Sequence, residues 1–87
     1  MTNELTNKLT VVIVAFNSND LLIECIDNVI GFKVLIVDNG KNEKIFSKLD
    51  YQKNNIQIIS KNKNLGFPKG INYAVEFVKT SYFLVLN

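Results

Sequence analysis

The segment LTVVIVAFNSND, residues 9–20, decides the fold of this chain. Residues 9–16 are almost wholly apolar and rich in valine, a pattern typical of a strand buried on both faces of a sheet. Residues 17–20 are Asn, Ser, Asn and Asp, whose side chains are preferred at the N-cap of a helix. The segment therefore predicts a buried strand followed by a capped helix, which is the first unit of a parallel α/β sheet.

Strands and helices alternate along the rest of the chain. After residue 20, apolar side chains recur at helical spacing up to Val29, and Gly31 is expected to end this helix. Further strands are predicted at residues 33–37, 56–60 and 82–86, and further helices at residues 43–49 and from Pro68 onward. The order β-α-β-α-β-α-β predicts an α/β fold with an open parallel sheet and helices on both faces.

Composition limits the possible functions. The chain has 87 residues, enough for one domain, and its 10 basic residues are all lysines, scattered among 8 acidic residues. This distribution lacks the clustered basic face of a nucleic-acid-binding protein, so we expect no nucleic-acid partner. With one cysteine and no histidine, an internal disulfide and a zinc site of the Cys/His type are both excluded.

The ends of the chain and its longest apolar runs bear on location. Residues 1–10 are polar and include an acid, unlike a signal peptide. No apolar run approaches the roughly 18 residues of a membrane span. We therefore expect no membrane span and a cytoplasmic location, with residues 1–8 as a flexible N-terminus and residues 9–87 as the domain.

Polar side chains follow the predicted strands at the edge where ligands of parallel sheets bind. Asp38, after the second strand, is a candidate acceptor for a ribose hydroxyl or a base N–H, but Asp-Asn-Gly is also a favoured turn sequence. Phe16 is a stacking surface for a base or else a core aromatic residue. Asn17 is a ligand contact or else a helix cap. The local sequence leaves these alternatives open.

Other motifs exclude common mechanisms or stay ambiguous. The first turn, Phe-Asn-Ser-Asn-Asp, lacks the glycines of a dinucleotide-binding site, no P-loop occurs, and a Ser/His/Asp triad is impossible without histidine. Gly66 and Gly70 flank the start of the last helix, where they serve close approach of a phosphate or else loop geometry and packing. Cys25 lies on an apolar helix stripe and is predicted to be a small buried side chain.

Four segments, in this order, resemble the N-terminal, nucleotide-binding half of family 2 glycosyltransferases with the GT-A fold. VVIVAFN at residues 11–17 is a strand that ends in an aromatic residue and Asn, and VLIVDNG at residues 34–40 ends in Asp and a small turn. Residues 64–72 have the form N-x-G-x-x-x-G-x-N, and YFLVLN at residues 82–87 is similar to the rhamnosyltransferase-like branch. The resemblance covers nearly the whole chain from Leu9 onward.

The resemblance implies that the chain recognises a UDP-, dTDP- or GDP-linked sugar for transfer to a glycan or lipid-linked acceptor. Residues 15–17 would line the base, Asp38 would bond the base or the ribose, and residues 64–72 would close over the nucleotide. The nucleotide-binding residues implied in this way are Ala15, Phe16, Asn17, Asp38, Asn39, Gly40, Asn64, Gly66 and Asn72.

The chain departs from the family pattern where catalysis is concerned. Asn87 would begin the D-x-D-like metal motif, but the aspartate that would hold Mg²⁺ or Mn²⁺ does not follow it, and the acceptor-binding half and catalytic base are absent. Ala15 stands where a polar residue is common, and residues 64–72 contain no arginine. We therefore expect a divalent cation only in a full-length enzyme, and no transfer by these 87 residues alone.

Other hypotheses stay open beside a glycosyltransferase. The apolar residues 82–86 predict an exposed edge strand, which we expect a C-terminal half or a partner chain to cover. A chain that keeps the fold and has lost its ligand would be a non-catalytic remnant or interaction module. An unrelated flavodoxin-like binding domain would need an anion-binding loop after the first strand, and that turn contains no glycine.

Overall fold

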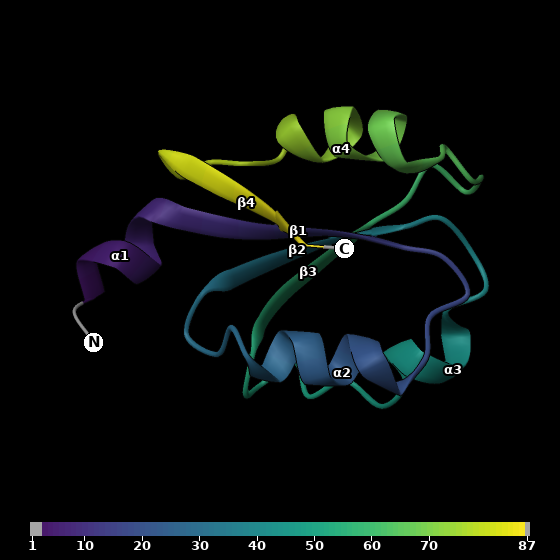
Figure 1. Ribbon diagram of the computed structural model, residues 1–87, viewed down its shortest axis with the longest axis horizontal. Helices are drawn as coiled ribbons and strands as arrows, with labels where there is room; N and C mark the ends of the chain where they lie inside the picture. The colour runs from purple at the N-terminus through teal and green to yellow at the C-terminus, as the bar shows by residue number, and fades with distance from the viewer. Residues whose placement is uncertain (1–2, 87) are drawn as a thin grey trace.

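The structure, a computed structural model, describes residues 3–86 as one four-stranded parallel sheet with helices packed against it (Figure 1). The strands are β1 (Leu9–Ala15), β2 (Lys33–Asp38), β3 (Asn55–Ile59) and β4 (Tyr82–Leu86). The helices are α1 (Asn3–Lys8), α2 (Asp20–Asp27), α3 (Glu43–Phe46) and α4 (Phe67–Val75). The predicted α/β class and parallel sheet are confirmed.

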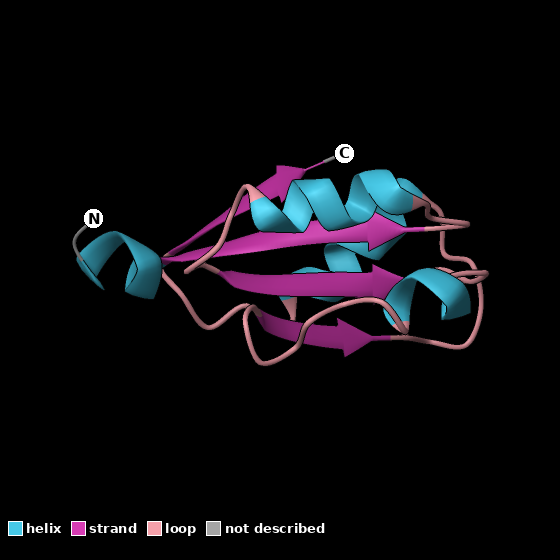
Figure 2. Cartoon of the chain, turned by 90° about the horizontal axis from the view of Figure 1, so that it is seen from below, coloured by secondary structure: helices cyan, strands magenta, loops and turns pink. Residues whose placement is uncertain are grey.

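The strands lie in the order β3-β2-β1-β4. β2 and β3 therefore follow one another on one side of β1, and β4 lies on its other side. Right-handed crossovers that run in opposite directions along a sheet place their helices on opposite faces. Accordingly, α2 and α3 cover one face and α4 covers the other (Figures 1 and 2). Because the strands are parallel, their carboxyl ends share one edge of the sheet.

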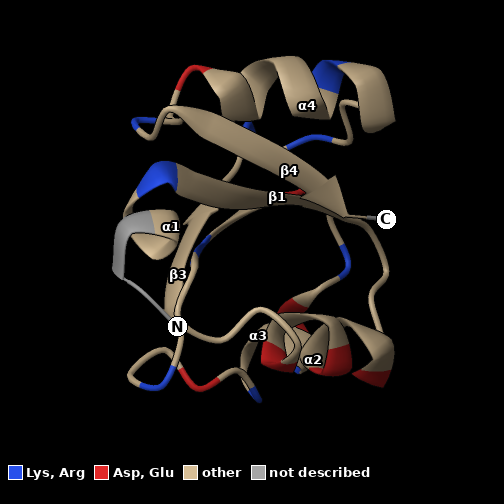
Figure 3. Ribbon diagram, turned by 60° about the vertical axis from the view of Figure 1, so that its left-hand side comes forward, with Lys and Arg blue, Asp and Glu red and all other residues tan. Residues whose placement is uncertain are grey.

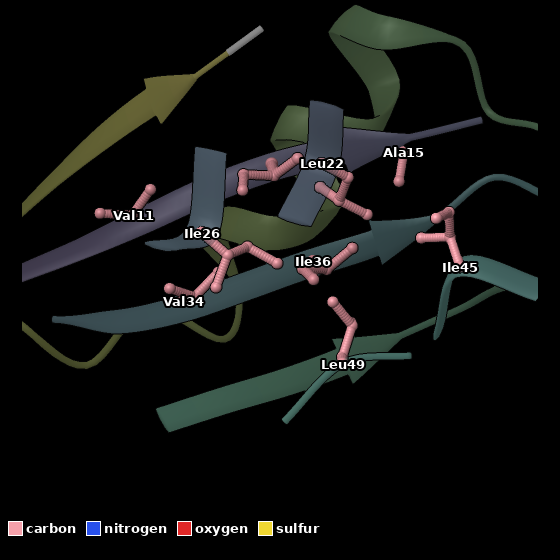
Figure 4. Packing of buried hydrophobic residues seen from close by; sticks show 9 residues of the cluster. Val11, Ala15, Leu22, Ile26, Val34, Ile36, Ile45 and Leu49 are labelled. Carbon is pink, nitrogen blue, oxygen red and sulfur yellow. The ribbon is translucent and has the colours of Figure 1, made fainter. Parts of the chain in front are cut away.

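β1 and β2 form the centre of the sheet and are buried on both faces. On one face Ile36 packs with Ile26 of α2 and Ile45 of α3 (Figure 4). On the other face Leu35 packs with Ala74 of α4. This two-sided burial explains why both strands are continuous apolar runs instead of alternating ones.

Gly70 brings α4 close to the sheet. A Cβ at this position would lie 3.1 Å from Cγ1 of Val14 in β1, which is tighter than ordinary van der Waals contact. Pro68 lies in the first turn of the helix, as predicted. Of the two roles open to Gly70, the structure supports packing.

Several element boundaries differ from the predictions. α1, which precedes β1, was not among the predicted helices. α2 ends at Asp27 with Asn28 as its C-cap, so Gly31 lies in the turn before β2, at φ +95°, and does not end the helix. α3 ends at Phe46 because the next turns are tighter: the Leu49 N–H bonds the carbonyl three residues earlier.

In the described part of the chain, β4 is an edge strand that pairs with β1 alone. Its side chains Tyr82, Phe83 and Leu84 are 67%, 43% and 46% exposed. The predicted exposed apolar edge is therefore present among the described residues.

Candidate functional site

A hollow opens where the strand order reverses, at the carboxyl end of β1. Leu86, the last described residue of β4, pairs with Ile13, two residues before the end of β1. Ligands of open α/β sheets bind near such a reversal. The hollow has a volume of about 290 Å³, and we call it the β1 hollow. Its lining comes from β1, the following loop and α2: Ile13, Val14, Ala15, Phe16, Asn17, Ser18, Asn19, Leu21, Leu22 and Cys25.

A second hollow, of about 260 Å³, lies beyond the ends of β2 and β3. We call it the β2–β3 hollow, and it is lined by Asp38, Asn39, Gly40, Ser60, Asn62 and Lys63. Phe16 links the two hollows: it lines the first, and a Cβ at Gly40 would lie 3.8 Å from its ring. Both hollows lie at the edge where the sequence predicts a ligand.

Asp38 shapes a turn and also keeps a free acceptor. Its Oδ1 accepts hydrogen bonds from the backbone N–H of Gly40 at 2.9 Å and from Nδ2 of Asn42 at 2.7 Å. Among residues 3–86, no hydrogen-bond donor reaches its Oδ2. The half-buried carboxylate lines the β2–β3 hollow. The two interpretations of Asp38 are thus compatible, because one oxygen holds the turn while the other can accept a hydrogen bond from a ligand.

Asn42 is a residue of this site that the sequence analysis did not find. It is 2% exposed and stands at the N-cap of α3, yet its side chain makes no capping bond. Instead, Nδ2 donates to the Ala15 carbonyl at 2.9 Å as well as to Asp38, and Oδ1 accepts from the Ser18 N–H at 3.0 Å. The side chain therefore joins the ends of β1 and β2. Locally, an asparagine before a helix resembles any other cap, so no sequence signal distinguishes it.

Asn39 fastens the loop before α4 to the end of β2. Its buried side chain donates from Nδ2 to the Gly66 carbonyl at 3.1 Å, and its Oδ1 accepts from the Leu65 N–H at 3.2 Å. Its backbone N–H also bonds the Ala15 carbonyl at 2.8 Å. Asn39 therefore shapes the wall of the β2–β3 hollow through contacts within the protein.

Phe16 presents an aromatic surface at the end of β1. It is 48% exposed and lies outside both clusters of core residues, which favours the stacking interpretation over a core aromatic residue. Nζ of Lys41 lies 5.7 Å from the ring centroid, within the range of a cation–π contact. Gly40, at φ +117°, provides the left-handed turn that lets this loop approach the ring.

Asn17 is not the helix cap. The N-cap of α2 is Asn19, whose Oδ1 accepts from the Leu21 N–H at 3.0 Å. Asn17 adopts a left-handed conformation at φ +49°, which asparagine tolerates better than most residues, and its N–H bonds the Gly40 carbonyl at 3.0 Å. Its exposed side chain lines the β1 hollow and remains available to a ligand.

The segment 64–72 reaches the site at its beginning only. Oδ1 of Asn64 accepts from the Gly66 N–H at 2.8 Å, and Gly66 adopts φ +77°, a conformation that favours glycine. Asn39 ties this turn to β2. Asn64 and Gly66 line neither hollow themselves, and Asn72, which is exposed on α4, lines neither of them as well.

Comparison with known proteins identifies the family. A family model described as Glycosyl transferase family 2 matches residues 10–87. The chain belongs to glycosyl transferase family 2. A teichoic acid poly(glycerol phosphate) polymerase of Staphylococcus epidermidis is 30% identical over 91 residues. That match covers 93% of this chain but only 12% of the polymerase, and no solved structure matches the chain.

The resemblance to glycosyltransferases implies a divalent cation in a full-length enzyme. Residues 3–86 contain no group of three or more His, Cys, Asp or Glu side chains that would hold a metal ion. Asn87, predicted to begin the metal motif, lies outside the described residues. The described residues of this family 2 chain thus do not fit the cation, and we assign no step to it.

Positive charge borders the two hollows of this family 2 chain. Lys63 lines the β2–β3 hollow, and Lys41 lies over Phe16, which lines the β1 hollow. Much of the acidic charge is on α2 and α3 instead (Figure 3). Lysines around the carboxyl edge attract an anion such as a diphosphate.

Cys25 is a free cysteine on α2 and is partly buried. Burial raises the pKa of the Cys25 thiol above its ordinary value, which disfavours the reactive thiolate. This agrees with a small, partly buried side chain.

Within residues 3–86, even α4, with 9 residues, is too short to cross a membrane, and no other helix is long and apolar enough.

Proposed function

We propose that this family 2 chain binds the nucleoside diphosphate of a UDP-, dTDP- or GDP-linked sugar along its carboxyl edge. The observation that carries the proposal is Asp38, whose Oδ1 is fully engaged while its Oδ2 has no partner among residues 3–86. A carboxylate oxygen is an acceptor only, so it suits a base N–H or a ribose hydroxyl. The exposed ring of Phe16 lies beside the same turn.

Each part of the nucleotide has a complementary group in this proposal. The base stacks on Phe16, because aromatic stacking is favourable for every nucleobase. The base N–H or ribose hydroxyl donates to Oδ2 of Asp38. The diphosphate lies near the lysines that border the hollows, where Coulomb attraction favours it. Asn17, Asn64 and Gly66 lie around the same edge, and we propose that they contact the nucleotide.

Transfer itself requires groups that the two hollows do not supply. An inverting transferase needs a carboxylate to deprotonate the acceptor hydroxyl and positive charge to neutralise the leaving diphosphate. Among the described residues, Asp38 is the only carboxylate that lines either hollow, and its Oδ1 is committed to the turn. We therefore propose that the 87 residues bind the donor without turnover, in the cytoplasm, and that a longer enzyme adds Mg²⁺ or Mn²⁺.

Two observations bear on the transferred sugar and on the acceptor. The YFLVLN segment supports rhamnosyl transfer, whereas the name of the similar polymerase supports a teichoic acid polymer as the acceptor or product. Because the chain covers 12% of that polymerase, both are proposals about an enzyme longer than this chain.

A nucleotide titration followed by ¹⁵N–¹H NMR tests the binding. We expect UDP, dTDP or GDP to shift the amide resonances of Phe16, Asp38 and Gly66. Asp38→Asn keeps an oxygen for the turn but replaces the free oxygen with an amide NH2 group, which cannot accept a hydrogen bond, so we expect affinity to fall at least about ten-fold. Asp50→Asn is the matched control, because Oδ1 of Asp50 also holds a turn through the Gln52 and Lys53 N–H groups, but Asp50 lines neither hollow.

The outcomes separate the hypotheses. A folded chain that responds to no nucleotide would contradict donor binding and support a remnant or interaction module. Equal losses in Asp38→Asn and Asp50→Asn would contradict the role of Asp38. Sugar transfer by the 87 residues would contradict the proposal that they act only in binding.

A further inference from the structure

We propose that Asn42 is a positioning residue: it holds the Asp38 carboxylate in a single orientation, so that Oδ2 remains available to a ligand in the β2–β3 hollow. The inference rests on the proposed nucleotide site and adds to it a residue that contacts no ligand itself. Its basis is the side-chain bond from Nδ2 of Asn42 to Oδ1 of Asp38 at 2.7 Å.

The bonding pattern of Asn42 is specific to its amide. One N–H of Nδ2 is used by Asp38, the other by the Ala15 carbonyl, and Oδ1 is used by the Ser18 N–H. An aspartate of the same size could accept from Ser18 but could not donate, and it would place a second negative charge beside Asp38. Only a side chain with two donors and one acceptor at this reach meets all three partners.

The location of Asn42 gives the bond its directing effect. At 2% exposure the side chain is shielded from water, so hydrogen bonds to it do not compete with solvent. A bond to a charged carboxylate is also stronger than one between neutral groups. With the Gly40 N–H on the same oxygen at 2.9 Å, two donors fix one end of the carboxylate and leave the other end free.

A second Asp–Asn pair at the same spacing shows that spacing alone does not produce this contact. Asn54 follows Asp50 as Asn42 follows Asp38, and it is also buried, at 5% exposure. Its Nδ2, however, donates to the backbone carbonyl of Asp50 at 3.2 Å and not to the carboxylate. Asn54→Ala therefore removes a buried asparagine amide without touching a carboxylate, which makes it the matched control.

The first test is made without nucleotide, so that its failure is separate from failure of the proposed function. Three-bond Hα–Hβ couplings report the χ1 rotamer of Asp38. We expect a single staggered rotamer in the wild-type chain and in Asn54→Ala, and averaged couplings in Asn42→Ala and Asn42→Asp. Averaged couplings in the wild type, or a single rotamer in both Asn42 variants, would overturn the proposal.

The second test is a double-mutant cycle on nucleotide affinity, with UDP, dTDP and GDP as probes. We expect Asn42→Ala to weaken binding about ten-fold in the wild-type background and not at all in Asp38→Asn, where no carboxylate is left to orient. Equal losses in both backgrounds would mean that Asn42 acts only on the fold, and would overturn the proposal. Absence of binding by the wild type would contradict the proposed function, while the coupling measurement would still judge Asn42.

Folding of the variants is part of the test. Asn42→Asp keeps the volume and the acceptor for Ser18, whereas Asn42→Ala adds no charge beside Asp38, so the two variants disturb the fold in different ways. Unfolding of both variants under conditions where Asn54→Ala folds would make Asn42 a residue required for folding, and would also overturn a positioning role.

Discussion

β2 and β4 are both short, apolar, parallel strands, but their side chains differ in burial. In β2, Val34, Leu35, Ile36 and Val37 are each at most 1% exposed. In β4, the first three side chains are 43–67% exposed. β2 has a strand on each side and helices on both faces, whereas β4 pairs with β1 alone among the described strands. Burial here follows position in the sheet, since apolar content is similar in both strands.

The two strands also differ at their carboxyl ends. β2 leads into a turn with three side-chain hydrogen bonds. Asn42 donates to Asp38 and to the carbonyl at the end of β1, and Asn39 donates to the Gly66 carbonyl. A candidate site can form there because its side chains lie at or just after the end of a strand that is buried on both faces, and hydrogen bonds within the protein hold them. β4 ends at Leu86, beyond which the chain is not described. The predictions below test how far this contrast extends.

The largest expected effect is on the core of β2. Ile36→Ala should lower the free energy of unfolding by about 2–5 kcal/mol, because Ile36 is fully buried between β1, β3 and the helices. Leu84→Ala, in β4, should lower it by about 1 kcal/mol or less, since nearly half of the side chain is already exposed. Urea unfolding measures both. Similar losses of unfolding free energy in the two variants would contradict the difference in burial between β2 and β4.

The polar network at the end of β2 should give the next largest effect. Asn39→Ala should cost about 1–3 kcal/mol, because the Leu65 N–H and the Gly66 carbonyl lose buried partners. Hydrogen exchange should become faster at Leu65 specifically. Exchange that stays slow there would show that the loop before α4 does not depend on Asn39.

A charge in β4 should change association more than stability. Leu84→Lys should change the free energy of unfolding by about 0.5 kcal/mol or less, because the side chain stands on an exposed edge. It should also reduce self-association, since a charged edge strand pairs poorly with another copy. Sedimentation equilibrium at increasing concentration measures this. A wild-type chain that stays monomeric throughout would show that the exposed edge does not pair with itself.

The smallest effect concerns Cys25, on the side of the sheet that α2 covers. Burial raises the pKa of its thiol in the folded chain, so the unfolded chain loses this proton first as the pH rises. The contribution of Cys25 to stability is therefore complete below the ordinary thiol pKa and decreases above it. We expect Cys25→Ala to be less sensitive than the wild type to a change from pH 7 to about pH 10. An identical pH dependence would show that the thiol is not buried in solution.

Sequence patterns predicted the elements better than their ends. The four strands were found because buried parallel strands are continuous apolar runs, and Pro68 marked the start of α4. Gly31 was wrongly expected to end α2, because a glycine with positive φ serves a turn before a strand as well as a helix end. α1 was missed because its residues are polar and have no apolar periodicity.

The candidate site was predicted only in part, for a similar reason. Asp38 and Phe16 follow buried strands directly, so their place at the carboxyl edge could be inferred. Asn42 could not be found, because its partners Ala15 and Ser18 are distant in sequence and its own surroundings resemble an ordinary cap. Asn72 fits the family pattern but stands on the exposed part of α4.

The sequence alone was sufficient to predict the α/β class, the order of the elements from β1 onward and the edge at which polar groups collect. These depend on local periodicity and on the rule that parallel strands end together. Only the tertiary structure decided which apolar strand is buried, which asparagine caps α2, and which one orients Asp38. Those features depend on contacts between residues far apart in the chain, and a local pattern carries no information about a partner that only folding brings near.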